Sequence, residues 1–434
     1  MNLSLRYWVF LIPLAVLLLH GVTIYRSDQS GTYEYSRARN DGDAGHFLRI
    51  AENISRYGVY SDDYSGNPSE SATWRPPVWP LILAFFRTIT GEIFWIVLLK
   101  KLLELTIFGL GAFFLWRFEF MSSTSALALS AILVEPQYLK YSSTLLTESL
   151  SAVLMFLFCV LVLIGFKVPK YQFIAAAVGV IAILLHPVTI VFICLAFLLL
   201  LWKSLKSSRI HAVLLFSFFA LLIMIWPIRN HLTFQQGIFL TSSQGINFSK
   251  AWNEKVAETF NNTNYDVFAD ERLNFKFVAP EKIEEADGSV IKESKLFTFS
   301  TMKFMSLASY QQLGSIAAVK LKSNFNPFPE RPKAGLIELL ATLSRSLALL
   351  VLLATSVVFL TRLGYEKSSL ADWFVFAPIV IIGQATMAIV FLTSLRYNAV
   401  YSLILATGVV IVTVRGVGVA KHYFNRSVAT EGVA

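Results

Sequence analysis

The chain has 434 residues, of which 55% are hydrophobic and 15% are charged, and its mean hydropathy is +0.60. Because soluble domains carry about one quarter charged residues, this composition excludes an ordinary soluble protein and indicates a polytopic membrane protein. An acidic partner is one interpretation of the formal net charge of +9, but Lys and Arg in cytoplasmic loops are the favoured source in a membrane protein. Cys159 and Cys194 both fall inside apolar runs and give no disulfide framework.

The chain begins with the apolar run "MNLSLRYWVFLIPLAVLLLHGVTIY". A cleaved signal peptide is one interpretation of this run. Its apolar core is longer than a usual signal core, however, and no small-residue cleavage site follows it. We therefore expect an uncleaved first span.

Later apolar runs predict an all-α membrane protein with about ten transmembrane helices, since about 20 apolar residues cross a bilayer. The run 171–202 is either one long helix or two short ones, and His186-Pro187 favours a break into two. Lys100, Lys101 and Glu104 interrupt the apolar character of the second span. The predicted spans are 7–25, 93–116, 124–139, 145–166, 171–186, 187–202, 210–228, 335–360, 371–394 and 397–414.

Basic residues gather in alternate loops, which places both termini and these loops in the cytoplasm. The chain then divides into 1–228 with seven spans and an external loop 26–92, an external segment 229–334, and 335–434 with three spans and a cytoplasmic tail. Within 229–334, "VIKESKLFTFSTMKFM" predicts an amphipathic helix suited to the membrane interface. The basic residues are Arg6, Arg117, Lys167, Lys170, Lys203, Lys206, Arg209, Arg362, Lys367, Arg415, Lys421 and Arg426.

The stretch "GDAGHFLRIAENI" in the loop 26–92 predicts an amphipathic helix that starts near Asp43 and stops at Gly58. At a helix start a carboxylate accepts backbone N–H bonds and meets the positive end of the dipole, and both effects favour its ionised form. Asp43 is therefore a helix cap or a catalytic acid, and Asp41 competes for the cap. His46 shares its face and is a surface histidine or a metal ligand. Asp62 and Asp63 are expected to be solvated.

Four further residues carry charge at predicted span ends or at headgroup depth. Arg75 in "TWRPPVWP" precedes two prolines, which make a stiff, extended lead-in to the aromatic segment after them. At headgroup depth Arg75 either binds a lipid phosphate bidentately or anchors the interface. Glu148 in "LLTES" enters a span, where a carboxylate is costly and usually faces a polar cavity; a helix-start glutamate is the alternative. Arg229 and Arg396 lie on the side depleted of basic residues and suggest an anionic ligand, with snorkelling as the alternative.

The sequence contains no P-loop and no GxGxxG that opens a βαβ unit. An activated donor would therefore have to come from the membrane itself. Neither an internal repeat nor a low-complexity tract is evident.

The ordered set of motifs resembles the GT-C class of polytopic glycosyltransferases, in the group of protein O-mannosyltransferases and bacterial aminoarabinose transferases. The resemblance runs from about residue 40 to 415. Phe47 stands in place of a commoner Tyr, His186 stands where relatives carry Arg, and the proline usual after Arg396-Tyr397 is missing; 250–334 resembles nothing assignable. The matching elements are Asp43-Phe47-Ala51, Arg75-Pro76-Pro77 with Trp79-Pro80, "LLTES" with Glu148, "WPIRN" with Arg229, Gly245 with Asn247, and Arg396-Tyr397.

The resemblance implies an enzyme that transfers a sugar from a polyprenyl-phosphate donor to a hydroxyl of a lipid-linked glycan, a lipopolysaccharide or a protein. It implies Asp43 as general base, and Arg75, Arg229, Arg396 and Tyr397 around the donor phosphate. Glu148 and His46 are candidates for an auxiliary acid or a metal ligand, and a divalent metal stays open. Membrane lipids but no nucleic acid are expected as partners, with the active site on the outer face of a bacterial inner membrane.

Two other classes remain as alternatives. A secondary transporter would explain the many spans and the broken helix, but it predicts inverted repeats and a midplane site. A polymerase or ligase that joins lipid-linked glycans shares the donor chemistry and handles longer chains.

Overall fold

The computed structural model describes residues 15–22, 25, 42–121, 129–253, 255–256, 277–286, 288–325, 376–390 and 399–407. Within these ranges the chain is helical and contains no strand, which confirms the all-α class. Three helical segments there are long and apolar enough to cross a membrane, and they suggest a membrane protein: Glu148–Gly165, Pro187–Ser207 and Arg209–Phe234. The total of about ten spans stays a prediction, because 335–375 and 408–434 lie outside the described ranges.

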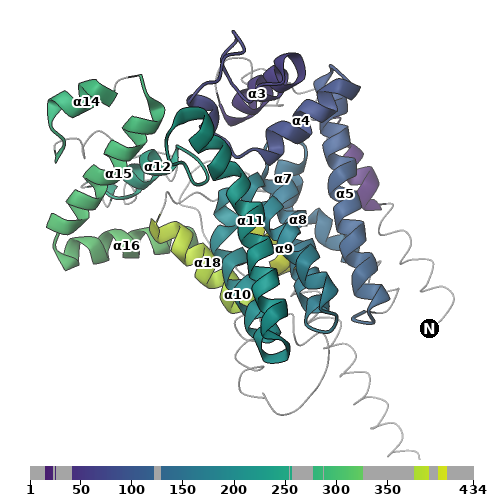
Figure 1. Ribbon diagram of the computed structural model, residues 1–434. Coiled ribbons are helices and arrows are strands. Elements are labelled where there is room, and N and C mark those ends of the chain that lie inside the picture. The colour runs from purple at the N-terminus through teal and green to yellow at the C-terminus, as the bar shows by residue number, and fades with distance from the viewer. Residues whose placement is uncertain are drawn as a thin grey trace, which may run out of the picture.

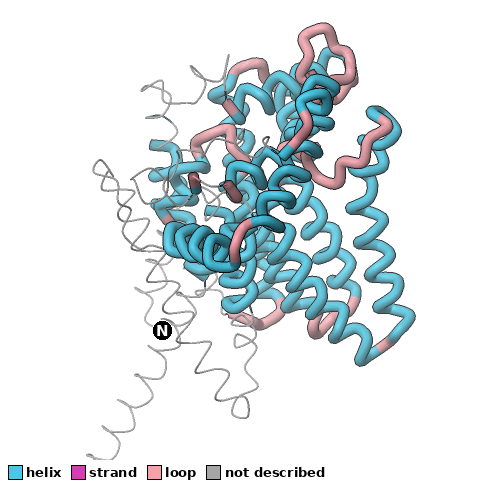
Figure 2. The backbone as a smooth tube through the Cα atoms, turned by 90° about the vertical axis from the view of Figure 1, so that its left-hand side faces the viewer, coloured by secondary structure: helices cyan, strands magenta, loops and turns pink. Residues whose placement is uncertain are grey.

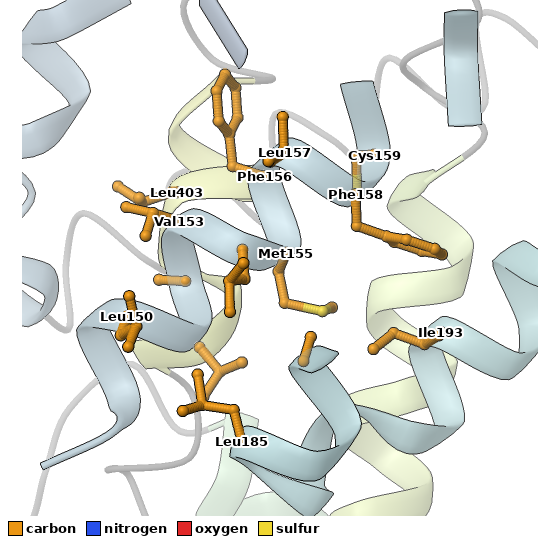
Figure 3. Packing of buried hydrophobic residues seen from close by; sticks show 14 of the residues in the cluster. Leu150, Val153, Met155, Phe156, Leu157, Phe158, Cys159, Leu185, Ile193 and Leu403 are labelled. Carbon is orange, nitrogen blue, oxygen red and sulfur yellow. The ribbon is translucent and has the colours of Figure 1, made fainter. Parts of the chain in front are cut away.

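The centre of the molecule is helix α8 (Glu148–Gly165), whose residues are all buried. A helix that is apolar on every face has to be surrounded by other helices, and α8 packs against α5 (Ile93–Arg117) and α9 (Lys170–Leu185). Figure 3 shows its side chains, including Val153, Met155 and Phe158, interdigitating with neighbours such as Ile193. Helices α10 (Ile190–Ser207) and α11 (Arg209–Phe234) complete this bundle.

The predicted break in 171–202 is confirmed. Helix α9 ends at Leu185, His186 is extended with φ −147° and ψ 103°, and a short 3-10 turn, η3 (Pro187–Thr189), leads into α10. Proline disfavours the helical conformation at the residue before it, so the chain leaves the helix at His186.

The expectation of one span over 124–139 is wrong for its described part. Residues 129–142 form a 3-10 turn, η2 (Leu129–Val134), and a separate short helix, α7 (Pro136–Ser142). Glu135 accepts a hydrogen bond from the backbone N–H of Tyr138, and Pro136 occupies the first helical position. Cap and proline together start a new helix here, which an apolar count does not detect.

The three charges of α5 do not interrupt the helix at the predicted span 93–116, although α5 is not among the three segments that are long and apolar enough to cross a membrane. The Lys101 ammonium lies 2.9 Å from one oxygen of Glu104, and the Lys100 ammonium lies 3.4 Å from the other. All three side chains are buried against α7 and the start of α8. Because buried charges are tolerated when they are paired, α5 continues unbroken to Arg117.

Two groups of elements lie outside the bundle (Figure 1). Helices α3 and α4 cover one end of it, and the tube view in Figure 2 shows that the described part consists of helices joined by loops. The predicted amphipathic helix "VIKESKLFTFSTMKFM" is confirmed as a helix within α15. The outer elements are α3 (Asp43–Tyr57), η1 (Ser71–Trp74), α4 (Val78–Ile89), α12 (Gln244–Ala251), α14 (Pro280–Ala286), α15 (Val290–Leu307) and α16 (Tyr310–Phe325). Helix α18 (Phe376–Val390) and η6 (Ala399–Tyr401) belong to the bundle, where they pack against α10 and α8.

Candidate active site

Helix α3 places Asp43 at its first residue and buries Phe47, Ile50 and Ala51 at helical spacing. It ends at Gly58, as predicted, where a left-handed φ of 69° lets the N–H of Gly58 bond to a carbonyl of the last turn. The cap residue is Gly42, and no side chain caps the helix. Asp43 therefore lies in the first turn, where the helix dipole favours its negative charge; Asp41 lies outside the described residues.

Arg75 brings a guanidinium to Asp43 from 32 residues further along the chain. Arg75 follows η1 directly, and its backbone is extended (φ −110°, ψ 136°), which directs its side chain back to α3. Its Nη2 lies 2.5 Å from Oδ1 of Asp43, its Nε donates to Nδ1 of His46 at 3.1 Å, and its carbon centre lies 5.1 Å from the Phe47 ring centroid. One arginine thus contacts three residues on the same face of α3.

His46 and Asp62 lie behind this pair and correct two expectations. Nε2 of His46 is 2.8 Å from Oδ2 of Asp62, and the two side chains are only 8% and 11% exposed. His46 is therefore a buried residue rather than a surface one, and Asp62 is not solvated. Oδ1 of Asp62 accepts hydrogen bonds from the hydroxyls of Ser69 and Ser71. Asp63, in contrast, is exposed as predicted.

The charges of this cluster are set by burial and by hydrogen bonds. Burial lowers the pKa of His46, against an opposing effect of its hydrogen bond to Asp62. Burial would raise the pKa of Asp62, but hydrogen bonds from His46, Ser69 and Ser71 outweigh it and hold this pKa well below its ordinary value. Asp43 and Arg75 are more open, at 29% and 19% exposure. The Asp43–Arg75 pair is therefore partly accessible, whereas the His46–Asp62 pair is largely covered.

Tyr60 links this cluster to Arg229 on α11. The Tyr60 hydroxyl donates to the carbonyls of Arg75 and Pro76 at 3.0 and 3.2 Å, and burial raises its pKa well above the ordinary value, so it stays protonated. Nη2 of Arg229 donates to the Tyr60 carbonyl at 3.2 Å. The Arg229 guanidinium also lies over the rings of Tyr60 and Trp226, 5.3 and 5.2 Å from their centroids. Arg229 thus reaches the site through Tyr60, and its predicted contact with a phosphate stays a prediction.

Glu148 lies apart from these contacts. It is fully buried at the first position of α8, and its Oε1 is 3.9 Å from Nε2 of His186. Helix α4 covers this region, since the indole N–H of Trp79 donates to the carbonyl of Leu145 at 2.7 Å. Arg396 and Tyr397 lie outside the described residues.

A metal site finds no support in the part of the chain that the structure describes. No three His, Cys, Asp or Glu side chains are grouped there as metal ligands. Both ring nitrogens of His46 already face other groups, Arg75 on one side and Asp62 on the other. The contacts therefore support His46 as a hydrogen-bond acceptor for Arg75 better than as a metal ligand.

Sequence reasoning missed Asp62 and Tyr60 as members of the cluster. The pattern of Ser69 and Ser71 after "YSDDYSG" is the only signal that hinted at a buried carboxylate accepting hydroxyl bonds.

Comparison of the chain with protein-family models, curated proteins and solved structures finds no match. Function has to be inferred from the residues themselves.

Proposed function

We propose that the chain is an integral membrane glycosyltransferase that moves a sugar from a polyprenyl-phosphate donor to an acceptor hydroxyl. The observation that supports this best is the 2.5 Å contact between Asp43 and Arg75 at a partly exposed position beside apolar helices. A carboxylate within hydrogen-bond reach of a hydroxyl serves as general base. A guanidinium beside it binds phosphate oxygens bidentately and stabilises the charge of a phosphate leaving group.

In the proposed reaction Asp43 takes the proton of the acceptor hydroxyl while the hydroxyl oxygen attacks the anomeric carbon of the sugar. The bond between that carbon and the phosphate oxygen breaks, and the electron pair leaves with the polyprenyl phosphate. Arg75 compensates the negative charge that builds on this oxygen. The acceptor is a hydroxyl of a lipid-linked glycan, a lipopolysaccharide or a protein.

A donor from the membrane fits the rest of the chain. The site lies at one end of the bundle that contains the three long apolar helices (Figure 1). The sequence has no nucleotide-binding motif that would hold a soluble sugar nucleotide. A polyprenyl phosphate dissolved in the bilayer would deliver its phosphate at the headgroup depth expected for Arg75.

One observation favours a second candidate, a secondary transporter. Lys100, Lys101 and Glu104 form an ionic cluster in the apolar bundle, and intramembrane charges often mark transport pathways. The Glu104 carboxylate already accepts hydrogen bonds from Lys101, Tyr138 and Ser149. Since these partners saturate it, the cluster is better suited to packing than to a moving substrate.

A glycan polymerase or ligase shares the proposed chemistry.

The test is sugar transfer in membranes that contain the full chain and radiolabelled polyprenyl-phosphate sugars. Asp43→Asn keeps the shape of the side chain and removes the base. We expect it to abolish transfer at normal expression, while Asp63→Asn, which neutralises the exposed carboxylate nearby, leaves transfer unchanged. Transfer that survives Asp43→Asn would exclude Asp43 as the base. Absence of transfer from every donor by the native chain would contradict the proposed function and call for a transport assay.

A further inference from the structure

We propose that His46 and Asp62 form a positioning dyad, in which Asp62 fixes a neutral His46 ring so that its Nδ1 holds Arg75 against Asp43. This inference rests on the proposed function, to which it adds two residues that do not touch the substrate. The covered position of both side chains fits such an indirect role, because only 8% of the His46 side chain and 11% of the Asp62 side chain are exposed.

The tautomer of His46 follows from its neighbours. A guanidinium has only N–H donors, so the 3.1 Å contact between Nε of Arg75 and Nδ1 of His46 requires a lone pair on Nδ1. The proton of the neutral ring then sits on Nε2, which faces the Asp62 carboxylate at 2.8 Å. Ser69 and Ser71 occupy the other oxygen of Asp62 and fix its orientation. Nε of Arg75 and the two serine hydroxyls thus each meet an acceptor, whereas Nε2 of His46 lies close to Oδ2 of Asp62 without the alignment of a hydrogen bond, so this contact is one of proximity and charge.

The dyad determines which edge of the guanidinium reaches Asp43. The bond to Nδ1 fixes the Nε of Arg75, and with Nε fixed, Nη2 lies against Oδ1 of Asp43. The Phe47 ring attracts the cation without directing any single N–H. Tyr60 holds only the backbone carbonyl of Arg75. His46 is therefore the contact that orients the guanidinium plane.

Protonation of His46 would break its hydrogen bond with Nε of Arg75. A second ring N–H, on Nδ1, would point at the Nε–H of Arg75, and two donors and two positive charges would face each other. The charged groups that act on the ring are Asp62, Arg75 and Arg49 of α3. Because burial lowers the pKa of His46 below 6.5, the neutral ring persists at neutral pH and is lost only on further acidification. Transfer should therefore fall on the acid side with the titration of His46.

The first test reads the geometry without any substrate. The full chain, labelled with 15N-histidine and reconstituted in proteoliposomes, is examined by solid-state NMR at pH 7.5, and the His46 signals are identified by their loss in His46→Asn. We expect the neutral tautomer protonated on Nε2, and a changed His46 signal in Asp62→Asn. An imidazolium, or a tautomer protonated on Nδ1, would overturn the dyad. This result does not depend on whether sugar transfer occurs, so it separates failure of the dyad from failure of the proposed function.

The second test measures kcat, KM and the pH profile of transfer. His46→Leu removes the acceptor for Arg75 and should lower kcat by ~10- to 100-fold, the range expected for a lost hydrogen bond to a charged group. His46→Asn offers an amide oxygen near the position of Nδ1, so it should recover most of this loss and show no acid limb from His46. Equal losses in both variants, or an acid limb that persists in His46→Asn, would overturn the positioning role. Asp63→Asn is the matched control.

Discussion

At Asp43 a carboxylate meets a guanidinium that three other contacts already hold in place. Nε of Arg75 bonds to His46, its carbonyl bonds to Tyr60, and its cation lies over Phe47. An acceptor hydroxyl must compete with this guanidinium for the carboxylate. An arriving phosphate would draw Arg75 toward itself and leave Asp43 open to the hydroxyl, so binding of the donor would prepare the base.

Arg75→Lys tests this requirement at the scale of one residue. Lysine keeps the positive charge but has no Nε–H for His46 and no planar fork for a phosphate and a carboxylate. Loss of one charge-assisted hydrogen bond predicts ~10- to 100-fold slower transfer at unchanged expression. Steady-state transfer kinetics in membranes give the measurement, with Arg56→Lys at the exposed end of α3 as the control. Native rates in Arg75→Lys would show that charge alone suffices.

At the scale of elements, the sequence predicted what depends on neighbours along the chain. The spacing of Phe47, Ile50 and Ala51 and the stop at Gly58 predicted α3, and His186-Pro187 predicted the break before α10. These signals are local, since a helical repeat, a left-handed glycine and a proline act within one turn. The same periodicity placed Asp43 at the helix start.

The remaining features depend on partners distant in sequence. Asp62 is largely covered because His46 and the two serines surround it, and no local pattern places those groups together. The charges of α5 looked like defects in a span, yet Glu104 is satisfied by Tyr138 and Ser149 on other helices. The error at 124–139 has a different cause, because hydropathy alone does not register a cap and a proline at Glu135-Pro136.

Gly245 offers a prediction about two packed helices. A Cβ at this position would lie 1.9 Å from the Ser294 carbonyl oxygen, so α12 could not keep its contact with α15. We expect Gly245→Ala to lower the free energy of unfolding by about 1–3 kcal/mol, the usual cost of overpacking. Thermal denaturation of the detergent-solubilised chain gives the measurement. Gly237→Ala, where no atom lies within 4 Å of the added carbon, is the control and should be neutral. A native melting temperature for Gly245→Ala would contradict this packing.

At the scale of the whole molecule, the candidate site and the α10–α11 turn lie at opposite ends of the bundle (Figure 1). Lys203, Lys206 and Arg209 gather at that turn, which the positive-inside rule assigns to the cytoplasm. In the topology that we predict, the Asp43–Arg75 pair faces outward, away from a cytoplasmic supply of soluble sugar nucleotides. The proposed lipid-borne donor and the proposed outward site therefore depend on the same charge asymmetry.

This orientation predicts the labelling of two single cysteines. In a Cys159→Ala, Cys194→Ala background, Ser65→Cys places a thiol in the exposed loop beside the site, and Ser207→Cys places one in the exposed α10–α11 turn. A membrane-impermeant maleimide added to intact cells or spheroplasts should label the first and not the second, and inverted membrane vesicles should reverse the pattern. Labelling of both from one side would mean that the three apolar helices do not separate these ends by a bilayer. The opposite pattern would put the site in the cytoplasm, where a soluble donor becomes available and the case for a polyprenyl phosphate loses its main support.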